Sequence, residues 1–113
     1  MYIHHMNSKL FRGSLDTIIL KLLKDNGRMY GYEISKIVKA KSEGNFSITE
    51  GSLYPALHKL ERKGLLETDI EKVDNRMRKY YKLSEKGKGA VKVEVEEMKS
   101  FIASLSLIVN PNN

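Results

Sequence analysis

The chain is short and basic: it has 113 residues, with 20 Lys and Arg against 14 Asp and Glu, and a net charge of +6 at pH 7. This length suits one domain with or without an appendage, and the charge favours a polyanionic partner, because each Lys or Arg on a phosphate releases a condensed counterion. The absence of cysteine excludes a disulfide framework, a thiolate metal site and a thiol nucleophile, and it fits a cytoplasmic protein. No apolar run approaches the roughly 18 residues of a bilayer-spanning helix, so we expect no membrane partner.

The N-terminal segment is expected to be a flexible lead over residues 1–9. His4 and His5 within it lack the third ligand that a metal site needs. Ser14 can cap the helix that follows, and Gly27 suits the end of that helix. The apolar residues in between share one stripe at helical spacing, formed by Leu15, Ile18, Ile19, Leu22 and Leu23. We therefore predict a first helix that is mostly buried.

Two further helices and a short strand are predicted in the middle of the chain. A thinner apolar stripe over Tyr32–Val38 indicates an amphipathic second helix that ends near Lys41. The segment Phe46–Thr49 alternates apolar and polar residues, which indicates a short strand. The third helix, Ser52–Lys63, has its apolar stripe at Leu53, Leu57 and Leu60.

A β-hairpin is predicted after the third helix. Two strand-like runs, Leu65–Val73 and Arg78–Leu83, flank Asp74 and Asn75, which are common turn residues. Three helices with a turn between the second and the third, followed by a hairpin, make a winged helix-turn-helix. The predicted fold is therefore mainly α with a small β-hairpin, and the winged helix-turn-helix domain covers residues 10–83.

The last segment is predicted to be one long helix over residues 84–109, followed by a tail at 110–113. Such a helix is about 39 Å long at roughly 1.5 Å per residue, so it extends beyond a domain of this size. Its apolar residues follow the a/d pattern of a coiled coil, at Val91, Val95, Met98, Ile102, Leu105 and Val109. We expect these residues to form a homodimer interface. The alternative is a helix that folds back onto its own domain, which needs a broader apolar stripe.

The hairpin carries an asymmetric charge. The segment Asn75–Lys82 contains Arg76, Arg78, Lys79 and Lys82 and no acidic residue, whereas the preceding segment Leu65–Asp74 is mostly acidic. An arginine at a hairpin tip can enter a narrow minor groove or bind a phosphate through its planar guanidinium. We therefore predict that Arg76, Arg78 and Lys79 contact duplex DNA, with a plain solvated wing as the alternative.

The outer side of the third helix and the residues before it form a second candidate DNA surface. Its polar side chains are Ser47, Thr49, Ser52, Tyr54, His58, Lys59, Arg62 and Lys63. The hydroxyls of the first three suit phosphate anchoring at the helix N-terminus, and ordinary helix capping is the alternative. Tyr54 either reaches a phosphate or a base methyl, or packs against the second helix. Lys59 and Arg62 are expected to contact phosphates, and no arginine lies in the first turn, where guanine readout is usual.

Three segments carry recognisable motifs: GSLYPALHKLERKGL at 51–65, LFRGSLD at 10–16 with GYEI at 31–34, and RMRKYYKLSEKG at 76–87. Together they resemble the PadR family of bacterial regulators, in particular its short subgroup with a single C-terminal helix. The resemblance implies a homodimeric repressor that binds palindromic promoter DNA and whose C-terminal helix crosses that of the partner subunit. Some family members bind planar aromatic compounds between the subunits, often against an aromatic residue of the last helix. This chain has no Trp, so the nearest candidates for such an effector pocket are Met98 and Phe101.

Two other classes of function compete with a DNA-binding regulator. A winged helix can also serve as a protein-protein interaction module, in which the basic wing binds an acidic protein surface. An enzyme is poorly supported, because the sequence has no Gly-rich phosphate loop, no metal-ligand cluster and no Ser/His/acid set with recognisable spacing. We therefore expect no enzymatic activity, no cofactor and no metal, and double-stranded DNA as the main partner.

Overall fold

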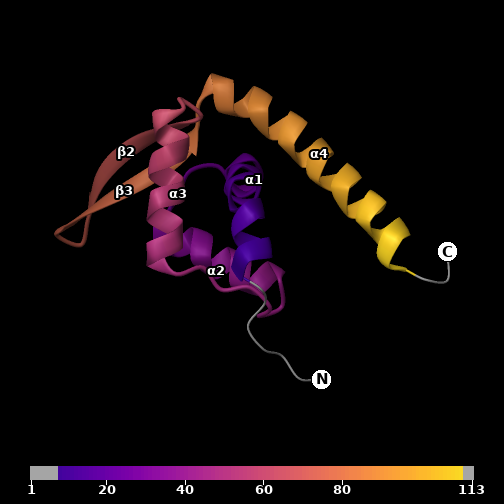
Figure 1. Ribbon diagram of the computed structural model, residues 1–113. Helices are drawn as coiled ribbons and strands as arrows, with labels where there is room; N and C mark the ends of the chain where they lie inside the picture. Colours follow the sequence, from indigo (N-terminus) through magenta and orange to yellow (C-terminus); the bar gives the residue numbers. More distant parts are fainter. Residues whose placement is uncertain (1–7, 111–113) are drawn as a thin grey trace.

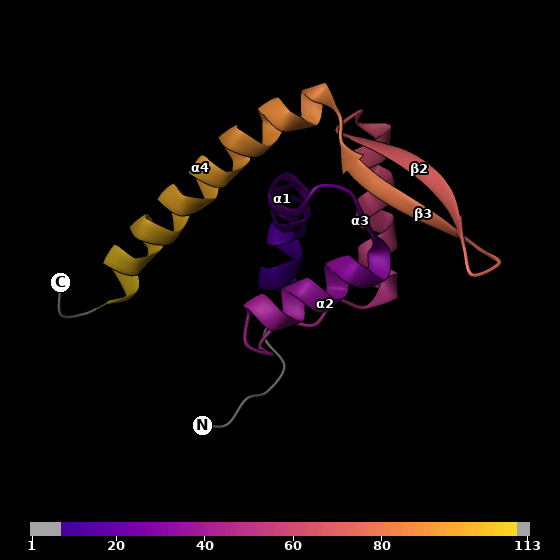
Figure 2. The ribbon, with the colours of Figure 1, turned by 180° about the vertical axis from the view of Figure 1, so that it is seen from behind.

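The computed structural model describes residues 8–110, with side chains from residue 13 onward. The elements in chain order are α1 (Ser8–Asn26), β1 (Met29–Tyr30), α2 (Gly31–Lys41), α3 (Glu50–Arg62), β2 (Leu66–Val73), β3 (Arg76–Leu83) and α4 (Glu85–Val109). Figures 1 and 2 show α1, α2 and α3 grouped in the middle, with the β2–β3 hairpin projecting on one side and α4 on the other. The predicted winged helix with a long C-terminal helix is confirmed. The His4-His5 pair, most of the predicted lead and residues 111–113 of the tail lie outside the described residues.

The core lies where the apolar stripes of the three grouped helices meet the hairpin and the last helix. Its largest fully buried side chains are Ile19, Leu20, Ile34, Leu57, Leu60, Tyr81 and Val91. Burying one aliphatic side chain of this size contributes roughly 1.5–3 kcal/mol. Because one core draws on all four helices and on β3, the hairpin and α4 are both anchored to the same body.

Helix α1 begins at Ser8, so the predicted start at Ser14 is wrong. Gly13 lies inside the helix, and a Cβ built on it would meet no atom within 4 Å. A glycine inside a helix costs only about 1 kcal/mol relative to alanine, while each added helical residue gains a hydrogen bond without a new nucleation step. The helix therefore continues through the Gly13-Ser14 pair.

The short strand lies before α2, and the predicted strand at Phe46–Thr49 does not form. The two apolar residues of that segment instead pack against the core from irregular backbone. The strand that completes the sheet is β1, which pairs antiparallel with Tyr80 and Tyr81 of β3. The strand order is β1-β3-β2, so β3 is the central strand and is paired on both sides at Tyr80 and Tyr81.

The hairpin is regular, with two antiparallel strands of eight residues each. Its turn residues Asp74 and Asn75 both have positive φ values, of 50° and 63°. This is the conformation of a two-residue type I′ turn, whose twist matches that of the flanking strands. Pairing therefore continues to the turn, and β3 begins at Arg76 rather than at the predicted Arg78.

The start of α4 is fixed to the base of the hairpin by one serine. The Oγ of Ser84 accepts a hydrogen bond from the Gly87 N–H at 3.0 Å and donates one to the carbonyl of Gly64 at 2.5 Å. A Cβ on Gly87 would collide with the carbonyl oxygen of Leu65, so this close approach requires glycine. Among the described residues, no helix, α4 included, combines the length and the hydropathy of a membrane-spanning segment.

Candidate nucleic-acid interface

Helix α3 presents one side to the core and the opposite side to solvent. Its buried residues are Leu53, Ala56, Leu57 and Leu60. At about 100° per residue, the line opposite them carries the exposed residues Gly51, Pro55, His58 and Arg62. Gly51 and Pro55 have no side-chain hydrogen-bond donor, so the N-terminal half of this outer line is smooth. Groups that read bases there must come from the flanks of the helix.

The residue before α3 acts as its cap. The Oγ1 of Thr49 accepts a hydrogen bond from the Ser52 N–H at 3.2 Å, and its hydroxyl donates to the Ser52 Oγ at 3.2 Å. Of the two interpretations of these hydroxyls, capping is the one that the structure shows for Thr49. Ser47 lies outside the cap, in a shallow hollow beside α2. Phosphate contacts by these hydroxyls stay a prediction.

Tyr54 packs against the start of α2. A Cβ added to Gly31 would lie 2.5 Å from the Tyr54 Oη and 2.9 Å from its Cζ, so the ring covers this buried glycine. The packing alternative of the sequence analysis is therefore the one observed. The side chain is still 37% exposed, and a contact between its outer edge and DNA stays a prediction.

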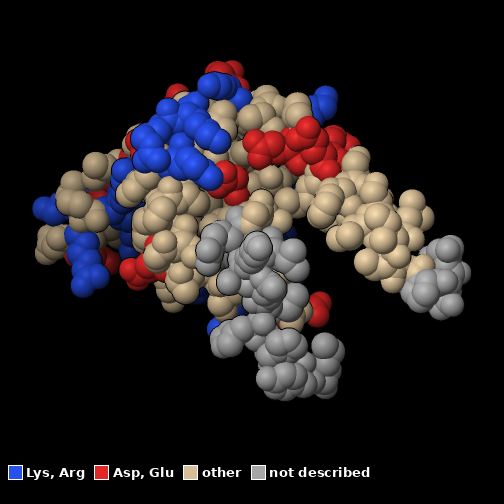
Figure 3. Space-filling model, viewed as in Figure 1, with Lys and Arg blue, Asp and Glu red and all other residues tan. Residues whose placement is uncertain are grey.

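Positive charge gathers over the C-terminal end of α3 (Figure 3). Lys59 and Arg62 lie in its last turn and Lys63 follows it, and all three are exposed. Lys59 pairs with Asp16 of α1, with 2.7 Å between Nζ and Oδ2. Lys86 donates from Nζ to the Lys63 carbonyl at 2.9 Å and so adds a further cation. Arg62 and Lys63 have no ion-pair partner in the described part of the chain.

The predicted wing cations differ in the contacts that they make within the chain. The Arg78 guanidinium lies 4.1 Å from the centroid of the Tyr30 ring, and the Lys79 Nζ lies 3.6 Å from Oε1 of Glu61 on α3. Arg76 follows the turn directly, is exposed, and has no ion-pair partner among residues 13–110. Of the three, Arg76 is thus the one that can meet a phosphate without breaking a contact inside the chain.

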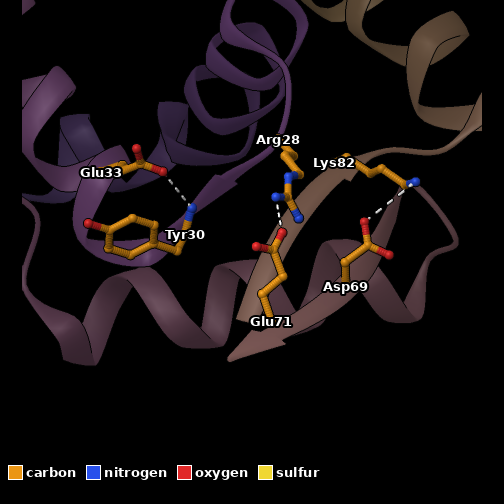
Figure 4. A network of polar contacts seen from close by, with 6 residues as sticks. All are labelled: Arg28, Tyr30, Glu33, Asp69, Glu71 and Lys82. Carbon is orange, nitrogen blue, oxygen red and sulfur yellow. Dashed lines mark hydrogen bonds and ion pairs between the residues drawn. The ribbon is translucent and has the colours of Figure 1, made fainter. Parts of the chain in front are cut away.

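Sequence reasoning missed Arg28, which lies in the turn before β1. Its guanidinium pairs with Glu71 of β2 (Figure 4), and the hydrogen bond to that carboxylate raises the pKa of Arg28 above its ordinary value. The two residues are 43 positions apart, so no local pattern could indicate the pair. Figure 4 also shows Lys82 with Asp69, at 3.6 Å between Nζ and Oδ2. Acidic side chains of β2 therefore neutralise Arg28 and Lys82, whereas Arg76 beside the turn has no such partner among residues 13–110.

The predicted dimer seam divides into two parts. Val91 is 1% exposed and Val95 packs against the core, because the first half of α4 lies on α1, where the Thr17 Oγ1 donates to Glu94 at 3.0 Å. Val91 therefore belongs to the core of its own chain and drops out of any interface. Beyond Met98 the helix leaves the body (Figure 1) and exposes Phe101, Ile102, Leu105, Leu107, Ile108 and Val109.

The residues considered for an effector lie where the free half of α4 begins. Phe101 is 64% exposed and borders an open hollow of about 460 Å³ together with Glu96, Glu97, Ser100 and Ser104. Met98 is partly buried and does not border this hollow. A second chain would be needed to close a pocket here. The described residues also include no group of three acidic or histidine side chains that could hold a metal ion.

A match to a known family covers most of the winged helix. Residues 19–93 fit the sequence model of the transcriptional regulator PadR-like family. The chain belongs to the PadR-like family. The matched segment includes all of α2, α3 and the hairpin, which carry the candidate interface. As a PadR-like protein, the chain is a transcriptional regulator and not an enzyme.

Similar proteins extend this likeness along the chain. An uncharacterised protein of Lysinibacillus sphaericus is 38% identical over 93 residues, which are 81% of this chain and 84% of the relative. The structure of a transcriptional regulator from Clostridium thermocellum matches with a TM-score of 0.82 and 34% identity, over 92% of this chain and 98% of the other. A PadR family transcription regulator from Clostridium difficile R20291 matches with a TM-score of 0.67 and 29% identity, over 82% and 94%. The PadR-like fold therefore accounts for most of this chain.

Proposed function

We propose that this PadR-like regulator is a repressor that binds a palindromic promoter site as a homodimer. Each copy sets α3 in the major groove and the hairpin tip on the flanking backbone. The observation that carries the proposal is the position of the uncommitted cations around the outer line of α3. Arg62 and Lys63 lie at one end of that line, and Arg76 lies at the hairpin tip. Each phosphate that such a cation neutralises releases a counterion and strengthens binding.

The free half of α4 supports the homodimer. Ile102, Leu105 and Val109 are 57%, 43% and 67% exposed, and no charged residue follows Lys99. Figure 3 shows this uncharged end beyond the acidic patch on the first half of the helix. An apolar surface of this kind marks a protein-protein contact, and the a/d spacing lets a second copy cover it with two-fold symmetry. The proposed interface consists of Val95, Met98, Ile102, Leu105 and Val109.

A two-fold symmetric protein favours a two-fold symmetric site. Two copies of α3 reach successive major grooves when their half-sites are about one helical turn, roughly 34 Å, apart. A planar aromatic effector held between the subunits, against Phe101 and Met98, would change this spacing and release the DNA. The regulator then acts in the cytoplasm, where both the promoter and such an effector are accessible.

Selection of bound duplexes from a random DNA library tests the proposal, and the affinity for the enriched duplex is then compared with a scrambled duplex. We expect an inverted repeat that is bound about 10³-fold more tightly than the scrambled duplex at physiological salt. A library that stays random, with equal affinity for both duplexes, would contradict sequence-specific binding. No binding even at low salt would favour the protein-protein interaction module.

A further inference from the structure

The outer half of the hairpin extends into solvent beyond the part that β1 supports. Ile70 and Met77, in its outer half, are 63% and 70% exposed, whereas β1 pairs only with Tyr80 and Tyr81 near the base. A two-stranded ribbon is marginally stable in water by itself. Contacts outside the ladder must therefore set the direction of the tip relative to α3.

Four side chains stack along the face of the hairpin that is turned away from α3. The Arg78 guanidinium lies 4.1 Å from the centroid of the Tyr30 ring, and that ring meets Tyr80 edge to face at 5.5 Å. The Arg28 guanidinium lies 4.1 Å from the centroid of the Tyr80 ring. Tyr30 and Tyr80 are also direct partners in the β1–β3 ladder. The stack thus ties β3 to β1 and to the turn before it.

Polar contacts extend this support to β2 and to the opposite face. Arg28 pairs with Glu71 of β2, as Figure 4 shows. On the face toward α3, Glu61 forms an ion pair with Lys79, with 3.6 Å between Oε1 and Nζ. Glu61 also accepts a hydrogen bond from the Thr68 Oγ1 at 3.5 Å. The hairpin is therefore held from both faces as far out as the Glu71–Arg78 pair, while its tip stays in solvent.

We infer that Arg28, Tyr30 and Arg78 are positioning residues, which fix the angle of the wing against α3 and support DNA binding without contacting DNA. This inference rests on the proposed function. In the sequence, the charge of Arg78 predicted a DNA contact. In this inference Arg78 supports the wing through Tyr30, and Arg76 makes the phosphate contact at the tip. A contact between an exposed cation and an aromatic ring stabilises the held wing enough to change its equilibrium with a loosened wing about twofold to fivefold.

Two substitutions, which we call the brace variants, weaken the stack in different ways. Tyr30→Leu removes the ring and leaves every charge in place, whereas Arg78→Lys keeps the charge but replaces the planar guanidinium with an ammonium that cannot stack flat on the ring. Tyr32→Leu is the matched control, because Tyr32 is 61% exposed on α2 and its ring is contacted by Lys36 from the same helix. For each variant, DNA affinity is measured over a salt series, and amide hydrogen exchange is measured in the free protein.

Both brace variants should weaken DNA binding about twofold to fivefold, with an unchanged slope of log K against log salt concentration. Amides in the outer half of the hairpin should exchange faster by a similar factor, and Tyr32→Leu should change neither quantity. The double variant Tyr30→Leu/Arg78→Lys should bind DNA about as tightly as Tyr30→Leu alone, because both substitutions act on the same contact. Exchange needs no DNA, so it tests the brace separately from the proposed function.

Two results would overturn the inference. One is unchanged amide exchange in both brace variants. The other is an Arg78→Ala variant whose salt slope falls by about one unit while Tyr30→Leu binds DNA normally, because this pattern identifies Arg78 as a phosphate contact. Circular dichroism checks that each variant is folded. If Tyr30→Leu unfolds, Arg78→Lys and Arg28→Gln decide the question by the same two measurements.

Discussion

The hairpin and α4 both project from the body of the molecule (Figures 1 and 2), yet they expose different chemistry. The hairpin ends in a charged tip at Arg76, and side chains of the same chain hold its strands from two faces. The free half of α4 is apolar, with Ile102 57% and Ile108 79% exposed. One projection is supported within the chain, and the other offers a bare apolar surface.

This difference assigns the two projections to different partners. A charged tip is well solvated, so contacts along the strands are enough to hold it, and Arg76 stays available for an anion. Exposed apolar surface costs about 25 cal/mol per Å² compared with the buried state, so the end of α4 favours a second apolar surface. The contrast therefore predicts DNA at the hairpin and another copy of the chain at α4.

The largest expected effect comes from placing charge on α4. The double variant Ile102→Lys/Leu105→Lys should be a monomer of about 13.0 kDa, because an unpaired ammonium is too costly to bury in an apolar interface. Loss of the second half-site should lower DNA affinity by roughly 100-fold or more. Light scattering after size-exclusion chromatography measures the mass. Val93→Lys is the control, since Val93 is 58% exposed but lies off the a/d seam; a double variant that stays dimeric would rule out this interface.

The next effect concerns the junction from which both projections start. Gly87→Ala should destabilise the fold by about 1–3 kcal/mol, because the added Cβ meets the Leu65 carbonyl oxygen. Gly89→Ala, in the same helix with no atom within 4 Å of an added Cβ, should instead stabilise it by about 0.5–1 kcal/mol. Thermal denaturation of the two variants gives the comparison. Equal melting temperatures would mean that Gly87 is not needed for this close approach.

A smaller effect is expected at the hairpin tip. Arg76→Ala should reduce the slope of log K against log salt by about one unit, because one phosphate is no longer neutralised. Lys92→Ala removes the same charge from an exposed position on the first half of α4 and should leave the slope unchanged. The slopes come from anisotropy titrations at several salt concentrations. Identical slopes for Arg76→Ala and the unaltered protein would remove the tip from the DNA interface.

The smallest effect concerns pH and the anchoring of the hairpin in the core. Burial raises the pKa of Tyr81 above its ordinary value of 10.0, so the folded chain keeps this proton more tightly than the unfolded chain. The corresponding stability is complete below pH 10 and is lost as the pH rises from there through the folded-state pKa. Denaturant unfolding at pH 9 and pH 11 should therefore show a smaller loss for Tyr81→Phe than for the unaltered protein. A loss of equal size in both would contradict the raised pKa.

Much of the fold could be predicted because its signals are local. The turn residues Asp74 and Asn75 are adjacent in sequence, and the repeat of α4 needs only the chain that carries it. The misplaced features depend on distant partners. Strand β1 has two residues, too few for any periodic pattern, and it exists because the edge of β3 accepts it. The start of α1 was misplaced because Gly13-Ser14 suits a cap locally, whereas an extended helix tolerates the pair.

The candidate site could be predicted in its charge but not in its contacts. The run from Arg76 to Lys82 placed the positive charge of the hairpin on its return strand. Neighbouring residues of a strand point to opposite faces, so Arg78 meets Tyr30 while Lys79 meets Glu61. Those partners lie on β1 and α3, and the sequence of charges in β3 does not indicate where these two elements pack. Val91 was placed in the dimer seam for a similar reason, since the a/d spacing does not reveal where the helix leaves its own body.

The central claim is that two chains, joined by the free ends of α4, read one two-fold symmetric site. Sedimentation of the complex with the selected palindrome, and with a duplex that holds only one half-site, tests it most directly. We expect two chains on the full palindrome, and binding weaker by roughly 100-fold on the half-site. One chain on each duplex, with equal affinity, would contradict it.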